Sequence, residues 1–298
     1  MKYPPLKGTG VAIVTPFDKK GSVDEKGLRK LVQHLIKGQV DYIVVLGTTG
    51  ENVTLNKEEK KQVIDLIVSE NKNRVPLVLG IGGNNTQQIL DDLNTYNLSP
   101  FCALLSVSPY YNKPSQEGIY QHYKVIAEHS PLPIILYNVP GRTSSNIQWQ
   151  TTIRLANDFK NIIAIKEASG NIEQIMKIIR HRPKNFLVIS GDDNLTLPLM
   201  ACGADGVISV VANAYPKHFS EMVRAALRGN FDKARKLHYL LMPFTEQLFA
   251  DGSPAGIKYA LSTLGIIQPW LRLPLVLPNK YVQDEIKKLI KQIGKEQL

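Results

Sequence analysis

Short apolar segments recur along the chain, each bounded by polar residues, glycine or proline. Segments this apolar are typical of strands that are covered on both faces, as in parallel sheets. Eight of them predict strands, at residues 11–17, 42–47, 76–82, 101–107, 133–139, 162–168, 186–192 and 206–212. The pattern therefore indicates eight buried, parallel strands.

The segments between these strands have the periodicity of amphipathic helices. In residues 25–38 one helical face carries Leu28, Leu31, Val32 and Leu35. In residues 58–71 the corresponding positions are Val63, Ile64, Ile67 and Val68. Strands and helices that alternate in this way favour a parallel (β/α)8 TIM barrel over an open doubly wound sheet.

From about residue 230 onward the pattern is helical only. We therefore predict two domains, a (β/α)8 catalytic barrel at residues 1–230 and a C-terminal helical domain at residues 231–298. We expect the helical domain to contribute to contacts between subunits.

Composition and charge exclude several classes of protein. The 298 residues are 43% hydrophobic and carry a formal net charge of +10, but the lysines lie in mixed runs such as KEEKKQ, which are typical of solvated helix faces. The sequence contains no basic block with interleaved aromatic residues, which is the pattern that would indicate nucleic-acid binding. No apolar run approaches the ~20 residues that cross a bilayer, and the N-terminus lacks a signal-peptide core. We expect a cytoplasmic protein without a membrane or nucleic-acid partner. The two cysteines are too few for a disulfide framework or a zinc site.

Polar motifs follow several of the predicted strands. In a parallel barrel the C-terminal ends of all strands face the catalytic mouth, so these motifs should converge there. They are GTTGE at 47–51, SPYYNKP at 108–114, YNVPGRT at 137–143, Lys166 and SGDD at 190–193.

Lys166 ends an apolar run, where a lysine is least expected. A purely structural explanation requires a partner such as Glu167 or Asp192, because an unpaired buried charge is costly. Glu167 should point to the opposite face of its strand. A lysine in a dry pocket loses some of its preference for charge, and its neutral amine attacks ketones and aldehydes. The chemistry therefore favours a Schiff-base lysine.

The neighbouring motifs fit this chemistry but also allow simpler explanations. The backbone and hydroxyl groups of Thr48 and Thr49 can bind a carboxylate, or a threonine there can cap a helix. The hydroxyls of Tyr111 and Tyr137 can pass protons, or the rings can simply pack. Arg142 can bind a substrate carboxylate through two hydrogen bonds, or lie on the surface.

Taken together, GTTGE, SPYYNKP, YNVPGRT, IKEASGN, SGDD and GVISVVAN, in this order and spacing, make the sequence resemble the dihydrodipicolinate synthase family. This family shares a superfamily with N-acetylneuraminate lyase. The resemblance implies a TIM barrel with a C-terminal helical domain, assembled as a homotetramer of two tight dimers. It also implies a class I aldolase-type lyase that condenses pyruvate with L-aspartate 4-semialdehyde, giving 4-hydroxytetrahydrodipicolinate in the diaminopimelate route to L-lysine.

The resemblance implies four catalytic residues. Lys166 matches the residue that forms the imine with pyruvate. Tyr137, Thr49 and Tyr111 match a proton relay, in which the tyrosine at the position of Tyr111 reaches across the tight-dimer interface. No metal and no organic cofactor is implied, because the lysine itself supplies the electron sink.

The resemblance also implies the substrate-binding residues. Thr48 and Thr49 match the site of the pyruvate carboxylate, and Gly191 and Ile208 match residues that line the same pocket. Arg142 matches the residue that binds the carboxylate of the semialdehyde. Sister lyases of the superfamily typically have serine before the threonine of the turn and lack this arginine, so Thr48 and Arg142 favour the synthase.

The sequence also bears on two other functional classes, an oxidoreductase and a noncatalytic barrel. Gly80 and Gly82 in LVLGIGGNN resemble part of a dinucleotide fingerprint, but Asn85 takes the third glycine position and no acidic residue for a ribose follows about twenty residues later. An oxidoreductase is therefore rejected. If the protein were a noncatalytic barrel that only binds a ligand, we would expect some of the residues implied for catalysis to be replaced. All of them are present.

The sequence departs from the family where lysine-inhibited relatives bind L-lysine. Those relatives carry small residues, then two histidines and a glutamate, at positions that here hold Asn52, Val53, Lys57, Lys60 and Gln88. Added positive charge and a lost carboxylate disfavour a cationic ligand. The sequence therefore predicts weak or absent feedback inhibition by L-lysine.

Overall fold

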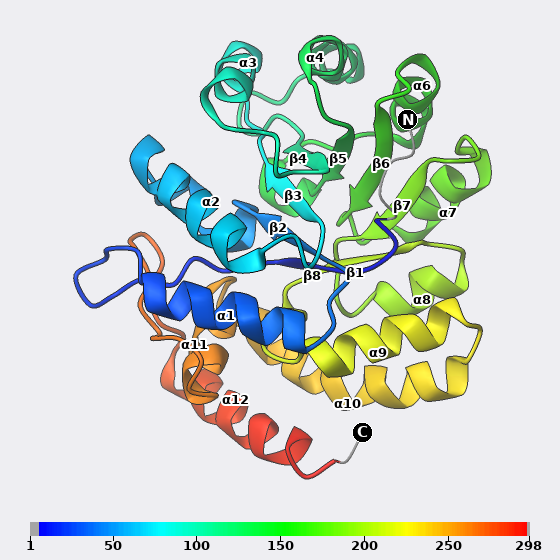
Figure 1. Cartoon of the computed structure of the whole chain (residues 1–298). Helices are drawn as coiled ribbons and strands as arrows, with labels where there is room; N and C mark the ends of the chain where they lie inside the picture. The colour runs from blue at the N-terminus through cyan, green and yellow to red at the C-terminus, as the bar shows by residue number, and fades with distance from the viewer. Residues whose placement is uncertain (1–5, 297–298) are drawn as a thin grey trace. The chain divides into compact units, whose positions relative to one another are not determined.

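The computed structural model describes residues 6–296 and contains a closed barrel of eight parallel strands in chain order (Figure 1). The strands are β1 (Gly8–Ala12), β2 (Tyr42–Val45), β3 (Leu77–Gly80), β4 (Ala103–Val107), β5 (Ile134–Asn138), β6 (Ile162–Glu167), β7 (Leu187–Ser190) and β8 (Gly206–Ser209). All are almost wholly buried, as their apolar sequences require. The predicted (β/α)8 barrel is confirmed.

Helices connect the strands and continue beyond the last one. They are α1 (Glu25–Lys37), α2 (Lys57–Asn71), α3 (Thr86–Thr95), α4 (Gln116–His129), α5 (Pro140–Thr143), α6 (Trp149–Asp158), α7 (Ile172–His181), α8 (Thr196–Ala201), α9 (Pro216–Leu227), α10 (Phe231–Phe249), α11 (Ala255–Thr263) and α12 (Lys280–Ile293). The predicted apolar face of α1 is buried throughout, and on α2 only Val68 of the predicted face is partly exposed. The helical C-terminal segment is also confirmed.

The first strand differs from its prediction. It spans Gly8–Ala12 rather than residues 11–17, because Gly8, Thr9 and Gly10 do not look like a buried strand in sequence. Gly10 belongs there for a steric reason: a Cβ atom on it would lie 2.2 Å from the ring of Tyr42 in β2. The other strands lie within the predicted ranges.

The described chain forms two compact units. Unit A comprises residues 6–7 and 76–208, and unit B comprises residues 8–75 and 209–296. In unit A, helices α3, α4, α6 and α7 pack side by side in chain order outside the strands (Figure 1). Strands β4, β5, β6 and β7 pair in parallel, and Tyr137 in β5 lies opposite Lys166 in β6.

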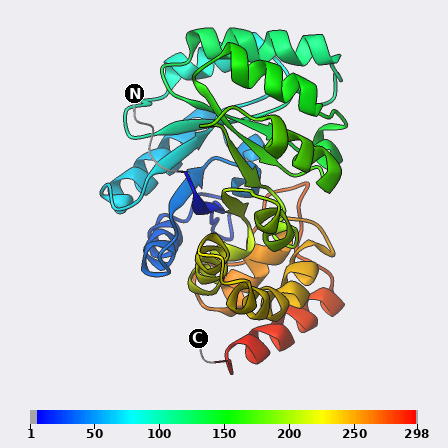
Figure 2. The same ribbon diagram turned by 90° about the vertical axis from the view of Figure 1, so that its right-hand side faces the viewer.

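Unit B contains β1, β2, α1, α2 and the C-terminal helices. Helix α10 packs along α9 and contacts α11 and α12, so these four helices form one packed group within the unit (Figure 2). The predicted boundary at residue 230 between a barrel and a helical domain stays a prediction. Within residues 6–296, no helix combines the length and apolar character needed to span a membrane.

Candidate active site

Lys166 lies in β6 and is buried, with 6% of its surface exposed. Its ammonium nitrogen lies 4.2 Å from the centroid of the Tyr137 ring. Among the described residues, no carboxylate forms an ion pair with this lysine. The carboxylate of Asp192 instead accepts the backbone N–H groups of Asn194 and Leu195 at the start of α8, at 2.9 and 3.1 Å. The structural explanation through an ion pair is therefore not realised.

The side chains of Lys166 and Tyr137 lie together because of strand register. The pair Tyr137–Lys166 and the next pair, Asn138–Glu167, occupy successive positions of β5 and β6. Successive side chains of a strand point to opposite faces. Glu167 accordingly bonds to the Nδ2 of Asn138, at 2.8 Å, and not to its neighbour Lys166. The predicted orientation of Glu167 is confirmed.

The sequence did not single out a buried polar network on that opposite face. Oε1 of Glu167 also accepts the Nε2 of Gln174 at 2.8 Å, and Gln174 in turn accepts the Nδ2 of Asn146 at 2.9 Å. Burial raises the pKa of Glu167, and hydrogen bonds from Ser169, Asn138 and Gln174 oppose the shift. A buried network of this kind stabilises a single backbone arrangement when its members are paired.

The network also fixes the segment that carries Arg142. Oδ1 of Asn138 accepts the backbone N–H of Ile147 at 2.9 Å, so the segment between these residues is closed at its base. Within it, Pro140 begins the one-turn helix α5, where the missing N–H of proline is tolerated. Arg142 lies in this helix and is exposed. The sequence signals for the network were Glu167 and Asn138, polar residues at the ends of their strands.

Gly191 and Ile208 lie in unit A with Lys166. A Cβ atom on Gly191 would lie 2.9 Å from Cε of Lys166 and 2.7 Å from Cβ of Ala168, so the lysine side chain occupies the space that a side chain at 191 would need. Ile208 is a fully buried residue of β8. Gly191 is thus adjacent to Lys166, and its place in the pyruvate pocket stays a prediction.

Tyr111 has an unusual backbone conformation for a bulky residue. Its φ is 70° and 89% of its surface is exposed. The turn is held on both sides, since Asn84 donates to the carbonyl of Tyr110 at 3.1 Å and Asn112 donates to the carbonyl of Asn84 at 2.9 Å. A conformation that costs energy yet is braced by its surroundings is frequent at functional sites.

The GTTGE turn belongs to unit B. Residues Thr48–Gly50 form a 3-10 turn, η1, in which Thr49 is buried and Thr48 is exposed. The N-cap position is Gly47, with no side-chain hydrogen bond, and α2 is capped by Asn56. The alternative in which a threonine caps a helix is therefore not realised.

Two further features bear on other classes of site. A Cβ atom on Gly82 would lie 2.5 Å from the backbone nitrogen of Val107 in β4, and Asn85 caps α3 through the N–H groups of Gln87 and Gln88. Packing and capping thus explain the glycine-rich segment without a dinucleotide. In residues 6–296, no group of three or more His, Cys, Asp or Glu side chains is arranged to hold a metal ion.

Comparison with known proteins places this chain in a family. The model of the dihydrodipicolinate synthetase family matches residues 5–293. The 4-hydroxy-tetrahydrodipicolinate synthase of Flavobacterium psychrophilum is 54% identical over 97% of this chain and 98% of its own.

Solved structures agree with this match. The chloride-inhibited dihydrodipicolinate synthase of Acinetobacter baumannii, complexed with pyruvate, is 40% identical, covers 97% of this chain and 99% of its own, and superposes with a TM-score of 0.94. A monomeric dihydrodipicolinate synthase variant is 38% identical over 97% of both chains, also with a TM-score of 0.94. The chain belongs to the dihydrodipicolinate synthetase family and is an aldolase-type lyase of that family.

Proposed function

We propose that this enzyme is a 4-hydroxy-tetrahydrodipicolinate synthase that condenses pyruvate with L-aspartate 4-semialdehyde. The observation that carries the proposal is Lys166, a buried lysine that has no carboxylate partner within residues 6–296 and lies against the ring of Tyr137. Such a lysine is a nucleophile once its nitrogen is neutral. The likeness to the Acinetobacter enzyme, solved with pyruvate, supports this substrate.

The proposed reaction proceeds through an imine. The neutral amine of Lys166 attacks the ketone carbon of pyruvate. Loss of one water gives the imine, and uptake of one proton from the proposed proton relay gives the protonated imine. Loss of a proton from the methyl group gives an enamine, whose carbon attacks the aldehyde carbon of the semialdehyde. This attack restores the protonated imine, and the resulting alkoxide takes up a proton and becomes a hydroxyl group. The amino group of this second substrate then attacks the imine carbon, releases Lys166 and closes the ring.

The remaining site residues are assigned to proton transfer and to binding. Tyr137, Thr49 and the exposed Tyr111 are proposed to carry protons to and from the intermediates. Thr48, Thr49, Gly191 and Ile208 are proposed to hold the pyruvate portion, and Arg142 the carboxylate of the semialdehyde. A guanidinium suits this task because it binds a carboxylate through two parallel hydrogen bonds.

The test is borohydride reduction in the presence of pyruvate, followed by peptide mass mapping. A pyruvate adduct on Lys166, together with condensation activity when the semialdehyde is supplied, is the expected result. Lys166→Arg should lose both, whereas Lys160→Arg, at an exposed lysine just before β6, should keep both. An adduct without condensation would move the assignment to a sister aldolase such as N-acetylneuraminate lyase. The absence of any adduct would refute imine chemistry.

We further propose a homotetramer of two tight dimers in the cytoplasm, with Tyr111 completing the proton relay of a second copy. The exposure of Tyr111 supports this role, because a proton-relay residue must be enclosed to act. Exposed apolar side chains after α11, at Leu273 and Val276, support further burial against another chain.

Feedback inhibition by L-lysine is proposed to be weak or absent. Lys57 and Gln88 are exposed and Lys60 is partly exposed, so the two ammonium groups are available to repel a cationic ligand. Gln88 donates to Asp92 at 3.1 Å. A titration with L-lysine should leave more than half of the activity at millimolar concentrations, and half-inhibition below that range would disprove the proposal.

A further inference from the structure

Glu51, the last residue of the GTTGE motif, is the buried residue that ends the turn of Thr48 and Thr49. It has a left-handed conformation, with φ of 53°, between η1 and a second 3-10 turn, η2 (Asn52–Thr54). Only 2% of its surface is exposed. A carboxylate buried in this way requires partners, because an isolated buried charge is costly.

Both partners of this carboxylate come from the C-terminal segment. Oε1 forms an ion pair with the ammonium of Lys258 in α11, and Oε2 accepts the backbone N–H of Arg272 at 3.3 Å. Lys258 is fully buried; it also donates to the carbonyl of Trp270 at 2.9 Å and lies 4.1 Å from the centroid of the Phe17 ring. The ammonium is therefore enclosed on several sides and aimed at Glu51.

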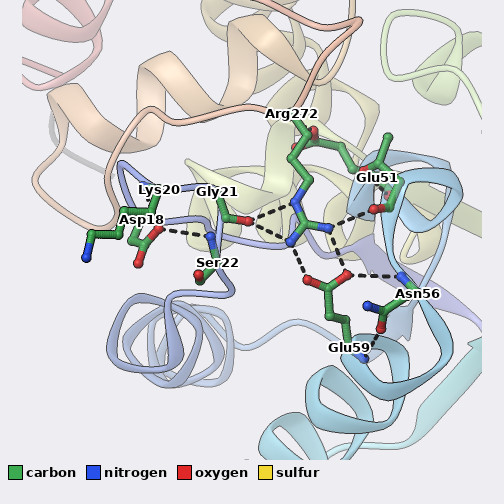
Figure 3. Close-up of polar contacts among 9 residues, drawn as sticks. Asp18, Lys20, Gly21, Ser22, Glu51, Asn56, Glu59 and Arg272 are labelled. Atoms are coloured by element: carbon green, nitrogen blue, oxygen red, sulfur yellow. Dashed lines mark hydrogen bonds and ion pairs between the residues drawn. The ribbon is translucent and has the colours of Figure 1, made fainter.

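The side chain of Arg272 holds the far end of the same segment (Figure 3). Its guanidinium donates to the carbonyl of Thr54, the last residue of η2, at 2.7 Å. It also donates twice to the carbonyl of Gly21, at 2.6 and 2.8 Å, and forms a two-point ion pair with Glu59 in α2. The segment from Glu51 to Thr54 is thus fixed at both ends by residues that lie far away in sequence.

We infer that Lys258 and Arg272 are positioning residues for the carboxylate-binding turn, and that Lys258 acts by neutralising Glu51. The inference rests on the proposed function, in which Thr48 and Thr49 bind the pyruvate carboxylate. An uncompensated anion on the residue that ends an anion-binding turn repels the ligand, and a buried carboxylate without a partner disturbs its surroundings. The ion pair removes both effects while Arg272 holds the backbone.

The test compares pyruvate dependence in four chains, the parent, Lys258→Met, the double variant Lys258→Met/Glu51→Gln, and Arg272→Met. Borohydride trapping at varied pyruvate gives the half-saturating concentration, and the condensation assay gives kcat. Lys258→Met should raise half-saturation about 10- to 100-fold, with a smaller change in kcat, since misplacing a binding group by about 1 Å costs up to about 100-fold. Glu51→Gln in the same chain removes the anion and keeps an acceptor for Arg272, so half-saturation should return to within about threefold of the parent.

The matched control removes another ion pair that is largely shielded from water. Arg182→Met/Asp205→Asn deletes a pair in unit A, where Asp205 precedes β8 and also accepts the N–H of Val188. It should lower the melting temperature without changing the half-saturating pyruvate concentration. If Lys258 has only a structural role, Lys258→Met should likewise lower the melting temperature and leave the half-saturating pyruvate concentration unchanged.

The outcomes separate this inference from the proposed function. Absence of an adduct in the parent would refute the proposed function. If the parent forms an adduct, two results would overturn the role of Lys258. One is a half-saturating pyruvate concentration that is unchanged in folded Lys258→Met. The other is a double variant whose half-saturating concentration is no lower than that of Lys258→Met. If Lys258→Met does not fold, Arg272→Met decides, because this side chain is partly exposed and its loss leaves the Glu51 ion pair in place. A severalfold rise in half-saturation supports positioning, and no rise overturns it.

Discussion

Gly191 leaves room for the side chain of Lys166 because glycine has no side chain of its own. A methyl group at this position would overlap Cε of Lys166 at 2.9 Å and Cβ of Ala168 at 2.7 Å. Gly191→Ala should therefore displace the amine and slow adduct formation with pyruvate about 100-fold, as expected for a displacement of about 1 Å. Timed borohydride trapping measures this rate. Gly294→Ala, at a glycine whose added methyl group meets only ordinary contacts, should react at the parent rate; equal rates in both variants would contradict the steric argument.

His122 should make stability depend on pH. It is buried in α4, with Nδ1 2.8 Å from the hydroxyl of Thr86, and burial lowers its pKa from 6.5 to about 4. Below pH 6.5 the imidazole of His122 binds a proton in the unfolded chain but not in the folded chain. The free energy of unfolding therefore decreases as pH falls from 6.5 toward 4. The loss from this residue should reach about 3 kcal/mol, and His122→Asn, which cannot titrate, should remove it.

Urea denaturation at several pH values measures this effect. The free energy of unfolding should fall less steeply between pH 6.5 and 4 in His122→Asn than in the parent. His129→Asn, at an exposed histidine of the same helix, should keep the slope of the parent. Identical slopes in all three proteins would show that His122 does not resist protonation in the folded state.

At the scale of secondary-structure elements, the contact between α10 and α11 depends on a glycine. A Cβ atom on Gly256 would lie 2.3 Å from the carbonyl oxygen of Leu248 and 2.7 Å from its Cα. Backbone atoms cannot yield as a flexible side chain can, so Gly256→Ala should lower the free energy of unfolding by about 2–3 kcal/mol. Gly83→Ala, with no atom within 4 Å of the added carbon, should change it by less than about 0.5 kcal/mol. Equal urea midpoints for the two variants would contradict close packing.

The strands and helices were predicted accurately where the local hydrophobic pattern of the sequence is clear. The strand that contains Lys166 was predicted within one residue, because four apolar residues in a row leave few alternatives. The first strand was misplaced because glycine carries no hydrophobic signal, and the reason for Gly10 is the ring of Tyr42 in a different strand. Steric reasons that lie in another element are invisible in a local window.

At the scale of the whole molecule, assembly is the main prediction. We expect sedimentation analysis to show four chains per particle, with dissociation to dimers on dilution and loss of activity on dissociation to monomers. The physical reason is Tyr111, which is 89% exposed in a single chain and is proposed to act in the site of a second copy. A fully active monomer would refute this role. Tyr111→Phe should lower kcat in the assembled enzyme without dissociating it.

The sequence by itself determined the alternation of strands and helices, and it singled out Lys166 as the proposed reactive lysine. Both are local signals: periodicity reports which side chains are buried, and a lysine after four apolar residues is chemically conspicuous. The family resemblance added proposed roles for residues such as Thr49 and Arg142, whose types alone allow simpler explanations.

Only the tertiary structure decided how the polar groups around these residues are paired. Glu167 bonds to Asn138 and Gln174, and Glu51 pairs with Lys258 of a helix near the other end of the chain. Each of these carboxylates has many potential partners in sequence, and the choice among them depends on which backbones the fold brings within hydrogen-bonding distance. Hydrophobic pattern is a property of each segment, whereas a buried polar contact is a property of two segments at once, so the first can be predicted locally and the second cannot.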